Sequence, residues 1–216
     1  MMMPDEKPKF FNPFVDIEKT ANNLPHWQQP GATYFITFRL GDAIPAALRT
    51  QWLSDQATFL RAHPRPWGPE VEEEYHLRFS HRVDQWLDAG HGECLLRDPC
   101  LRSVVEECLI FFDQQRYDQH AWVIMPNHVH TLTTLRPGWQ LEQVVSTWKS
   151  FTANRIHREL GRQGSLWQED YFDRLIRDAD HFSNVVRYIR RNPTKAKLSA
   201  GEYSSFATEL ANRMAP

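Results

Sequence analysis

The run AWVIMPNHVHTLTTL, residues 121–135, constrains the fold more than any other stretch of the chain. Two strand-forming segments, 119–125 and 128–135, flank a Pro-Asn corner, and this pattern predicts a β-hairpin. Side chains two residues apart in a strand project from the same face of a sheet, so His128 and His130 point together. Such a pair suits a shared metal ion or a shared phosphate, but the composition alone predicts roughly 0.5 such pairs, so a third participant is needed.

Other segments predict a mixed arrangement of strands and helices. Residues 32–40 alternate as a strand, and the stretch 166–177 is ambiguous, with an edge strand as one interpretation. Helical spacing and end signals predict helices over 44–63, 68–92, 98–115, 141–164 and 179–192, the last capped by Asp178 and terminated with the help of Pro193. We therefore expect an α+β fold in which a mainly antiparallel sheet carries helices on one face.

Composition excludes several classes of protein. The apolar runs are too short to cross a bilayer, and the first residues lack the order of a secretory signal, so we expect a cytoplasmic protein. Cys94, Cys100 and Cys108 have no metal-ligand spacing, which argues against a disulfide framework or a zinc knuckle.

Charge is distributed unevenly along the chain. Residues 1–136 carry 13 basic and 18 acidic side chains, whereas residues 137–198 carry 11 basic and 7 acidic ones. A basic half with tryptophans is typical of a polyanion-binding face, although ordinary solvated surfaces show the same unevenness.

The last predicted helix supplies the third participant for the histidines. Tyr188 and Asn192 are four residues apart, so they share one helix face. A phenol with a pKa near 10 is a poor nucleophile at neutral pH. A divalent cation held by two imidazoles and an amide oxygen would help it to attack a phosphate, and the resulting phosphotyrosine would conserve the bond energy for resealing.

Three blocks, WVIMPNHVH, LWQEDYFDRLIRD and YIRRNPTKAKL, resemble in order and spacing the single-tyrosine HUH transposases, and among them the REP-associated tyrosine transposases of bacteria. The resemblance spans roughly residues 30–200. It implies a ferredoxin-like fold with the histidine motif on a central strand and the catalytic tyrosine on a C-terminal helix. It also implies that Tyr188 is the nucleophile, that His128, His130 and Asn192 are metal ligands, and that the metal is Mg²⁺ or Mn²⁺.

The same resemblance implies a substrate and a domain organisation. Members of the family cut single-stranded DNA, often near hairpins, and work as monomers or homodimers, so we expect a DNA partner, no membrane and a place at the bacterial nucleoid. We expect an extended lead-in over 1–30, one transposase domain over 31–200 and a tail over 201–216. The segment at about 64–97 departs from short family members as a helical insertion, and its acidity argues against DNA contact.

Several side chains are candidates for DNA binding. Two tryptophans are available for base stacking and eight basic residues for phosphate contacts: Trp148, Trp167, Lys149, Arg155, Arg158, Arg187, Arg190, Arg191, Lys195 and Lys197. Any of the basic residues has an alternative interpretation as a solvated surface charge.

Three functions compete. The leading hypothesis is a metal-dependent tyrosine transposase that acts on hairpin-bearing single-stranded DNA. The main alternative is a domesticated DNA-binding protein without productive cleavage, and a small-molecule hydrolase would need a carboxylate beside the histidines, which the motif lacks. Tyr171, beside Asp170 and Asp173, is the rival nucleophile; we expect it to pack in the core.

Overall fold

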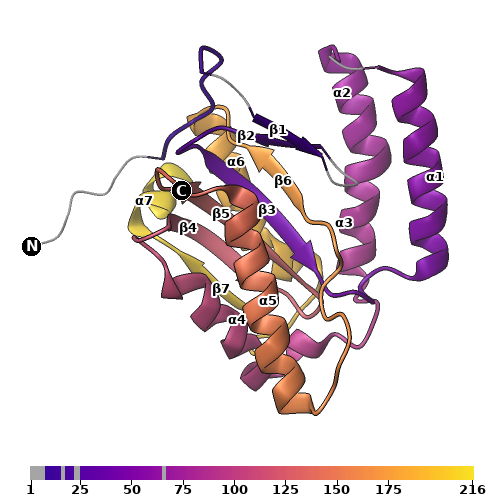
Figure 1. Cartoon of the computed structure of the whole chain (residues 1–216), viewed down its shortest axis with the longest axis vertical. Coiled ribbons are helices and arrows are strands. Elements are labelled where there is room, and N and C mark those ends of the chain that lie inside the picture. Colours follow the sequence, from indigo (N-terminus) through magenta and orange to yellow (C-terminus); the bar gives the residue numbers. More distant parts are fainter. Residues whose placement is uncertain (1–7, 16–17, 22–24, 65–66) are drawn as a thin grey trace, which may run out of the picture.

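The computed structural model describes residues 8–15, 18–21, 25–64 and 67–216, and its centre is a five-stranded antiparallel sheet (Figure 1). The strands lie in the order β6-β3-β5-β4-β7, with bounds Phe172–Leu175, Thr33–Arg39, His128–Leu135, Tyr117–Ile124 and Ser204–Ala207. The predicted hairpin forms as β4 and β5, and β5, which carries the histidines, is the middle strand of the sheet.

The order of elements along the chain is that of a ferredoxin-like fold. Strand β3 leads to helix α4, the β4-β5 hairpin follows, and helix α5 leads back to β6, which pairs with β3. This βαββαβ order with neighbours β6-β3-β5-β4 is the split βαβ arrangement. The predicted fold class is confirmed, and β7 adds a fifth strand beside β4.

Helices cover both faces of the sheet, so the prediction of helices on one face was incomplete. Helices α4 (Pro99–Phe111) and α5 (Leu141–Leu160) pack on one face, which we term the α5 face. Helices α6 (Ala179–Lys195) and α7 (Glu209–Met214) pack on the other, termed the α6 face. The reason is that β4 and β5 are buried on both faces, with all eight residues of β5 buried.

Local signals explain where the helices on the sheet begin and end. The side chain of Asp98 caps α4 by accepting from the Cys100 amide, and Pro99 occupies the first turn, where no amide hydrogen is needed. Asp178 caps α6 as predicted, with Oδ1 2.7 Å from the His181 amide nitrogen. Pro193 does not end α6, however, because it lies inside the last turn and the helix continues to Lys195.

A separate helical segment stands beside the sheet between β3 and α4. It consists of α1 (Ala46–Ala62), α2 (Pro69–Tyr75), a π-helical turn (His76–Ser80) and α3 (His81–Asp88), and we term these residues the helical arm (Figure 1). Aromatic rings at 4.8–6.2 Å, from Trp52, Phe59, Trp67, Tyr75 and Phe79, pack the arm internally. The arm therefore begins before residue 64, where we placed the insertion.

Both ends of the chain differ from the expected lead-in and tail. In the described part of 1–30, β1 (Glu18–Ala21) and β2 (Pro25–Gln28) pair as a two-stranded sheet, whereas residues 1–7, 16–17 and 22–24 lie outside the described residues. Residues 201–216 are not a tail, because they form β7 and α7, and Ala211 and Ala215 are fully buried under α6. Among the described helices, none combines the length and apolar character that a membrane crossing requires.

Candidate active site

His128 and His130 project from β5 toward α6. The antiparallel register places Arg39 opposite His128 and Thr37 opposite His130 on β3, and Val123 of β4 flanks His130 on the other side. Both imidazoles are buried, with 1% of each residue exposed. Their Nε2 atoms are 3.1 Å apart, so the alternation of the strand brings the two rings together as expected.

Hydrogen bonds at the Nδ1 atom of each ring hold the two imidazoles in this orientation. The Asn127 amide nitrogen donates to the carbonyls of Leu87 and His91 at 3.3 and 3.2 Å, which leaves Oδ1 as the atom 2.7 Å from His128 Nδ1. His128 Nδ1 must therefore carry the hydrogen, and Nε2 presents a lone pair to the site. Thr37 Oγ1 lies 2.7 Å from His130 Nδ1 and supports the second ring in the same way.

Burial keeps both imidazoles neutral. The pKa of His128 is lowered to about 3, first by burial and then by the positive charge of Arg39. The pKa of His130 is lowered well below 6.5 by burial and by the neighbouring His128. A neutral imidazole is the form that binds a metal ion.

Tyr188 and Asn192 reach the same place from α6. The Tyr188 hydroxyl lies 3.4 Å from His130 Nε2, and its ring meets the rings of His130 and Phe35 edge-on. Asn192 is 1% exposed, and neither its Oδ1 nor its Nδ2 makes a hydrogen bond of normal geometry among the described residues. The amide nevertheless lies close enough to His128 and Tyr188 to shift their pKa values. The structure thus gathers the four groups that the sequence singled out, and all four come from one chain.

The unpartnered amide allows a test of whether these residues fit a divalent metal ion. Two neighbouring ligands of an octahedral ion with bonds of 2.0–2.1 Å are about 3.0 Å apart, close to the 3.1 Å between the Nε2 atoms. Two lone pairs at this distance repel each other unless a cation or proton lies between them. A buried amide oxygen without a partner is a suitable third ligand. The set fits such an ion, and no cluster of three His, Cys, Asp or Glu occurs elsewhere in the described residues.

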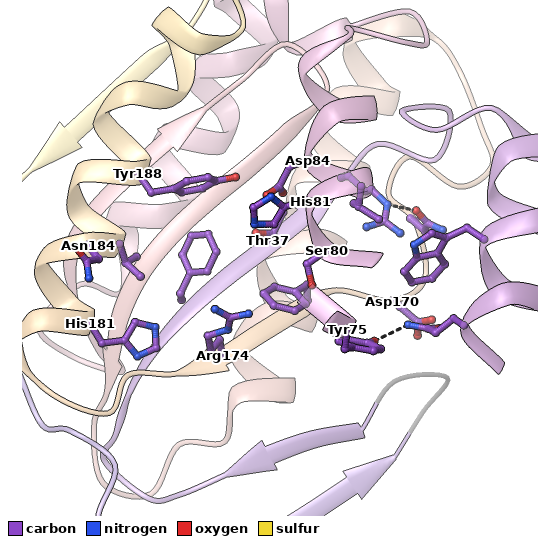
Figure 2. A pocket seen from close by; sticks show the side chains of 18 of the residues that line it. Thr37, Tyr75, Ser80, His81, Asp84, Asp170, Arg174, His181, Asn184 and Tyr188 are labelled. Atoms are coloured by element: carbon purple, nitrogen blue, oxygen red, sulfur yellow. Dashed lines mark hydrogen bonds between the residues drawn. The ribbon is translucent and has the colours of Figure 1, made fainter. Parts of the chain in front are cut away.

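Helix α3 of the helical arm contributes carboxylates to the site, which the sequence did not indicate. Burial raises the pKa of Asp84, while the charge of Lys195 and a hydrogen bond with Tyr188 oppose this rise. Figure 2 shows the Tyr188 hydroxyl pointing toward Asp84 across a cleft. Asp88 binds Lys195 Nζ at 2.8 Å. The pKa of Tyr188 is raised, mainly by burial and then by Asp84 and Asp88, so the phenol is protonated at neutral pH.

The predicted stacking tryptophans and the rival tyrosine lie elsewhere. Trp148 and Trp167, 1% and 4% exposed, are core residues of the α5 face, and their indole nitrogens donate to Tyr117 and Thr152. The prediction that they stack on DNA bases was wrong, because no ring face is accessible. Tyr171 is 6% exposed in the same core, on the face opposite the histidines.

The predicted basic residues are divided between the two faces. Those on α5 lie across the sheet from the site, where the Lys149 ammonium binds the Glu169 carbonyl and Arg155 lies over the Phe151 ring. On α6, Arg190 contacts the Ala215 carbonyl and the Asn212 side chain, which fastens α7 rather than leaving the charge free. The other three basic candidates on α6 are Arg187, which is half-buried, and Arg191 and Lys195, which are exposed. Lys195 pairs with Asp88 beside the site.

Asn127 and Thr37 also belong to the site, although sequence patterns did not single them out. Asn127 directly precedes His128, so its proximity was visible, but its role depends on the carbonyls of α3 and the loop after it. Thr37 required the register of β3 against β5, which no local pattern provides.

Comparison with known proteins agrees with the motifs. Residues 95–192 match the family model described as "Transposase IS200 like", a span that contains the histidine pair, Tyr188 and Asn192. The chain is 27% identical over 104 residues to a REP-associated tyrosine transposase of Escherichia coli (strain K12), which covers 46% of this chain and 61% of the relative. It is 28% identical over 118 residues to an uncharacterized protein of Haemophilus influenzae (strain ATCC 51907 / DSM 11121 / KW20 / Rd), covering 43% and 64%.

The chain thus matches less than two thirds of the length of each curated relative. Among solved structures, it is similar to a REP-associated tyrosine transposase bound to a REP hairpin, with a TM-score of 0.45, 18% identity, and coverage of 81% of this chain and 74% of that chain. The resemblance to the IS200-like, REP-associated tyrosine transposases that the motifs indicated is therefore confirmed by the family model and by the curated relative.

Proposed function

We propose that the chain is a metal-dependent nuclease and strand transferase that acts on single-stranded, hairpin-bearing DNA through a phosphotyrosine at Tyr188. One observation carries the proposal: the Tyr188 hydroxyl lies 3.4 Å from His130 Nε2, beside two facing imidazoles and an unpartnered buried amide. A buried tyrosine that only packs in a core needs neither a facing pair of imidazoles nor an unpartnered amide beside it.

The proposed reaction exchanges one phosphodiester for another. The Tyr188 oxygen attacks phosphorus, the bond from phosphorus to the 3′ oxygen breaks, and the products are a 5′-phosphotyrosine and a strand end that takes up a proton as a 3′-OH. In the second step a 3′-OH attacks the phosphotyrosine, and Tyr188 recovers its proton as the leaving group. No net hydrolysis is needed, so the strand can be rejoined.

The metal would be held by His128, His130 and Asn192. When bound, Mg²⁺ or Mn²⁺ supplies positive charge to the non-bridging phosphate oxygens. The protein residues position the other groups: Phe35 packs edge-on against the Tyr188 ring, and Thr37 and Asn127 orient the imidazoles. Asp84 lies at the Tyr188 hydroxyl, where a proton must leave during attack.

Because Tyr188 and the histidines belong to one chain, the proposed reaction needs no second subunit to complete the site. A monomer is therefore sufficient for cleavage, and a homodimer remains compatible with it. The substrate places the proposed activity at the bacterial nucleoid.

The test is covalent capture of DNA. The protein is incubated with single-stranded hairpin DNA labelled at its 3′ end, the side that stays bound to a 5′-phosphotyrosine, and with Mn²⁺, and denaturing electrophoresis then detects labelled protein. We expect an adduct that Tyr188→Phe abolishes and that Tyr171→Phe retains, since Tyr171 lies on the opposite face. An adduct that survives in Tyr188→Phe contradicts the assignment, and binding of the hairpin without any adduct favours a DNA-binding protein.

A further inference from the structure

A large cleft separates the helical arm from the sheet domain and ends at the candidate nucleophile. It has a volume of about 740 Å³ and is lined by α1 and α3 on one side and by β3, β6 and α6 on the other, with Tyr188 in its wall (Figure 2). Cavities of this size hold ligands comparable to one or two nucleotides. The arm, whose second half lies in the segment at about 64–97 with an acidity that argues against DNA contact, thus forms one wall of the cleft.

Two arginines from different elements, β3 and α1, line this cleft. Arg39 of β3 is the strand partner of His128, and its Nε contacts the Gln168 amide oxygen. Arg49 of α1 is exposed and lines the same cleft. Arg49 has no ion-pair partner among the described residues. Two guanidinium groups that line one cleft favour an anion there, and arginine binds phosphate through paired donors.

Aromatic side chains lie next to these arginines. Trp52 is three residues after Arg49 and so lies on the same face of α1, where its indole nitrogen donates to the Phe79 carbonyl at 3.2 Å. Phe172 of β6 lines the opposite wall, half-buried, with its ring 6.4 Å from that of Phe35. A flat base entering between the walls meets aromatic surface on both sides.

The charges of the cleft favour a single strand over a duplex surface. Four aspartates, Asp84, Asp170, Asp178 and Asp180, line it together with the arginines. A surface that binds a continuous run of phosphates would lack such carboxylates, because each carboxylate would repel the DNA backbone. Separate cationic, aromatic and acidic positions instead match one nucleotide, which has a single phosphate, a flat base and hydrogen-bond donors.

We propose that this cleft binds the single-stranded nucleotide adjacent to the scissile phosphodiester, with its phosphate at Arg39 and Arg49 and its base against Trp52. The proposal rests on the proposed function, since Tyr188 marks the scissile position. It makes the helical arm a substrate-binding element of this chain.

The experiment measures binding without cleavage. The Tyr188→Phe protein, in the presence of a chelator, is titrated against fluorescein-labelled oligothymidylate about 16 nucleotides long, and anisotropy is followed at several salt concentrations. We expect Arg49→Ala in this background to weaken binding about tenfold and to reduce the slope of log affinity against log salt by about 0.7. Trp52→Ala should weaken binding about 5- to 100-fold, and Trp52→Phe should restore most of it.

The matched control is Arg61→Ala, an exposed arginine of the same helix that does not line the cleft. It should bind as the parent does, and thermal unfolding of each variant shows whether the arm is folded. Equal binding by Arg49→Ala, Trp52→Ala and their parent overturns the proposal. So does an equal loss for the same sequence as a duplex, since that indicates a nonspecific phosphate contact.

These outcomes are distinct from those of the adduct assay. If oligothymidylate binding depends on Arg49 and Trp52 but no adduct forms in the catalytic assay, the cleft stands and the proposed chemistry fails. If an adduct forms at the same rate and with the same dependence on DNA concentration in wild type, Arg49→Ala and Trp52→Ala, the cleft is not the nucleotide site and the chemistry stands.

Discussion

On the α5 face of the sheet, a cluster of buried polar side chains is hydrogen-bonded together, whereas on the α6 face the buried amide of Asn192 has no hydrogen-bond partner among the described residues. The buried indole nitrogen of Trp122, on the α5 face, likewise has no partner in the described part of the chain. Thr131 and Thr133 both donate to Gln119 Oε1, at 2.7 and 2.8 Å, and Gln119 in turn donates to the Leu109 carbonyl of α4. Asn192 is equally buried, but its oxygen and nitrogen are both unpartnered. Both faces therefore carry an unpaired buried polar atom, but the one on the α6 face lies beside His128 and Tyr188, whose pKa values it shifts.

The contrast also runs between neighbours along β5. Val129 is buried in the apolar core of the α5 face, while His130 is buried on the α6 face against Thr37, His128 and Tyr188. An unpaired buried polar group costs about 1–3 kcal/mol, so an arrangement such as that on the α6 face persists where it has a use. The comparison teaches that neither burial nor a single unpaired atom, such as the Trp122 indole nitrogen, separates a core from a site. What marks the site is that the unpaired amide lies beside two facing imidazoles and a tyrosine hydroxyl.

The largest expected effect is a difference in adduct formation between variants of His130 and of Val129. We expect His130→Ala to reduce adduct formation about 10³-fold per folded molecule, because it removes a proposed metal ligand. Val129→Ala should leave that rate within about twofold while lowering the free energy of unfolding by about 2 kcal/mol. Rates from denaturing gels and stabilities from urea unfolding test the pair, and the comparison breaks if both variants lose activity equally.

Metal binding should stabilise the folded protein, and only residues of the α6 face should be required for this stabilisation. At Mn²⁺ concentrations about 100 times the dissociation constant, the free energy of unfolding should rise by about 2.7 kcal/mol. His130→Ala and His128→Ala should abolish this increase, whereas Thr133→Val on the other face should retain it. Calorimetric melting with and without Mn²⁺ measures the effect without requiring DNA cleavage. The same increase in His130→Ala would place the ion elsewhere.

Replacing the two kinds of buried polar group should change stability in opposite directions. Asn192→Leu removes an unpartnered amide at similar volume, so we expect it to stabilise the protein by about 1 kcal/mol while weakening Mn²⁺ binding about 10- to 100-fold. Thr133→Val removes a donor that Gln119 uses and should destabilise by about 1 kcal/mol. Urea unfolding of both variants decides this, and destabilisation by Asn192→Leu would mean that the amide has a partner in solution.

The smallest effect concerns the helical arm. Asp84→Asn should lower the pKa of Tyr188, because its carboxylate is one cause of the raised value, but the pKa should stay above 10, since burial is the larger cause. Ultraviolet titration of the wild type and the variant, with Tyr188→Phe to identify the signal, measures the shift. Asp55→Asn, on α1 of the same arm, is the matched control and should leave the titration unchanged.

Much of the fold followed from local patterns. The Pro-Asn corner between two strand-forming runs predicted β4 and β5, and Asp178 marked the start of α6. Pro193 misled the prediction of the helix end, because a proline in the last turn can be accommodated when the chain leaves the helix soon afterward. The burial of Ala211 and Ala215 under α6 has no local signal, because the segment around them is too short to show an amphipathic pattern.

The site was predictable only as far as its residues lie near one another in the chain. Composition could not show that Trp148 and Trp167 face the core, since a tryptophan suits a core and a DNA surface equally well. Charge counts also could not indicate that Asp84 lies beside Tyr188, because the two residues belong to α3 and α6, which are far apart in the chain.

By itself the sequence determined that two imidazoles share a strand face and that a phenol and an amide share a helix face, because strand and helix periodicity act over a few residues. Only the tertiary structure decided that these two faces meet, that Thr37 supports His130, and that the helical arm closes a cleft over Tyr188. Those contacts depend on strand register and on the packing of helices distant in the chain, and no local rule specifies either.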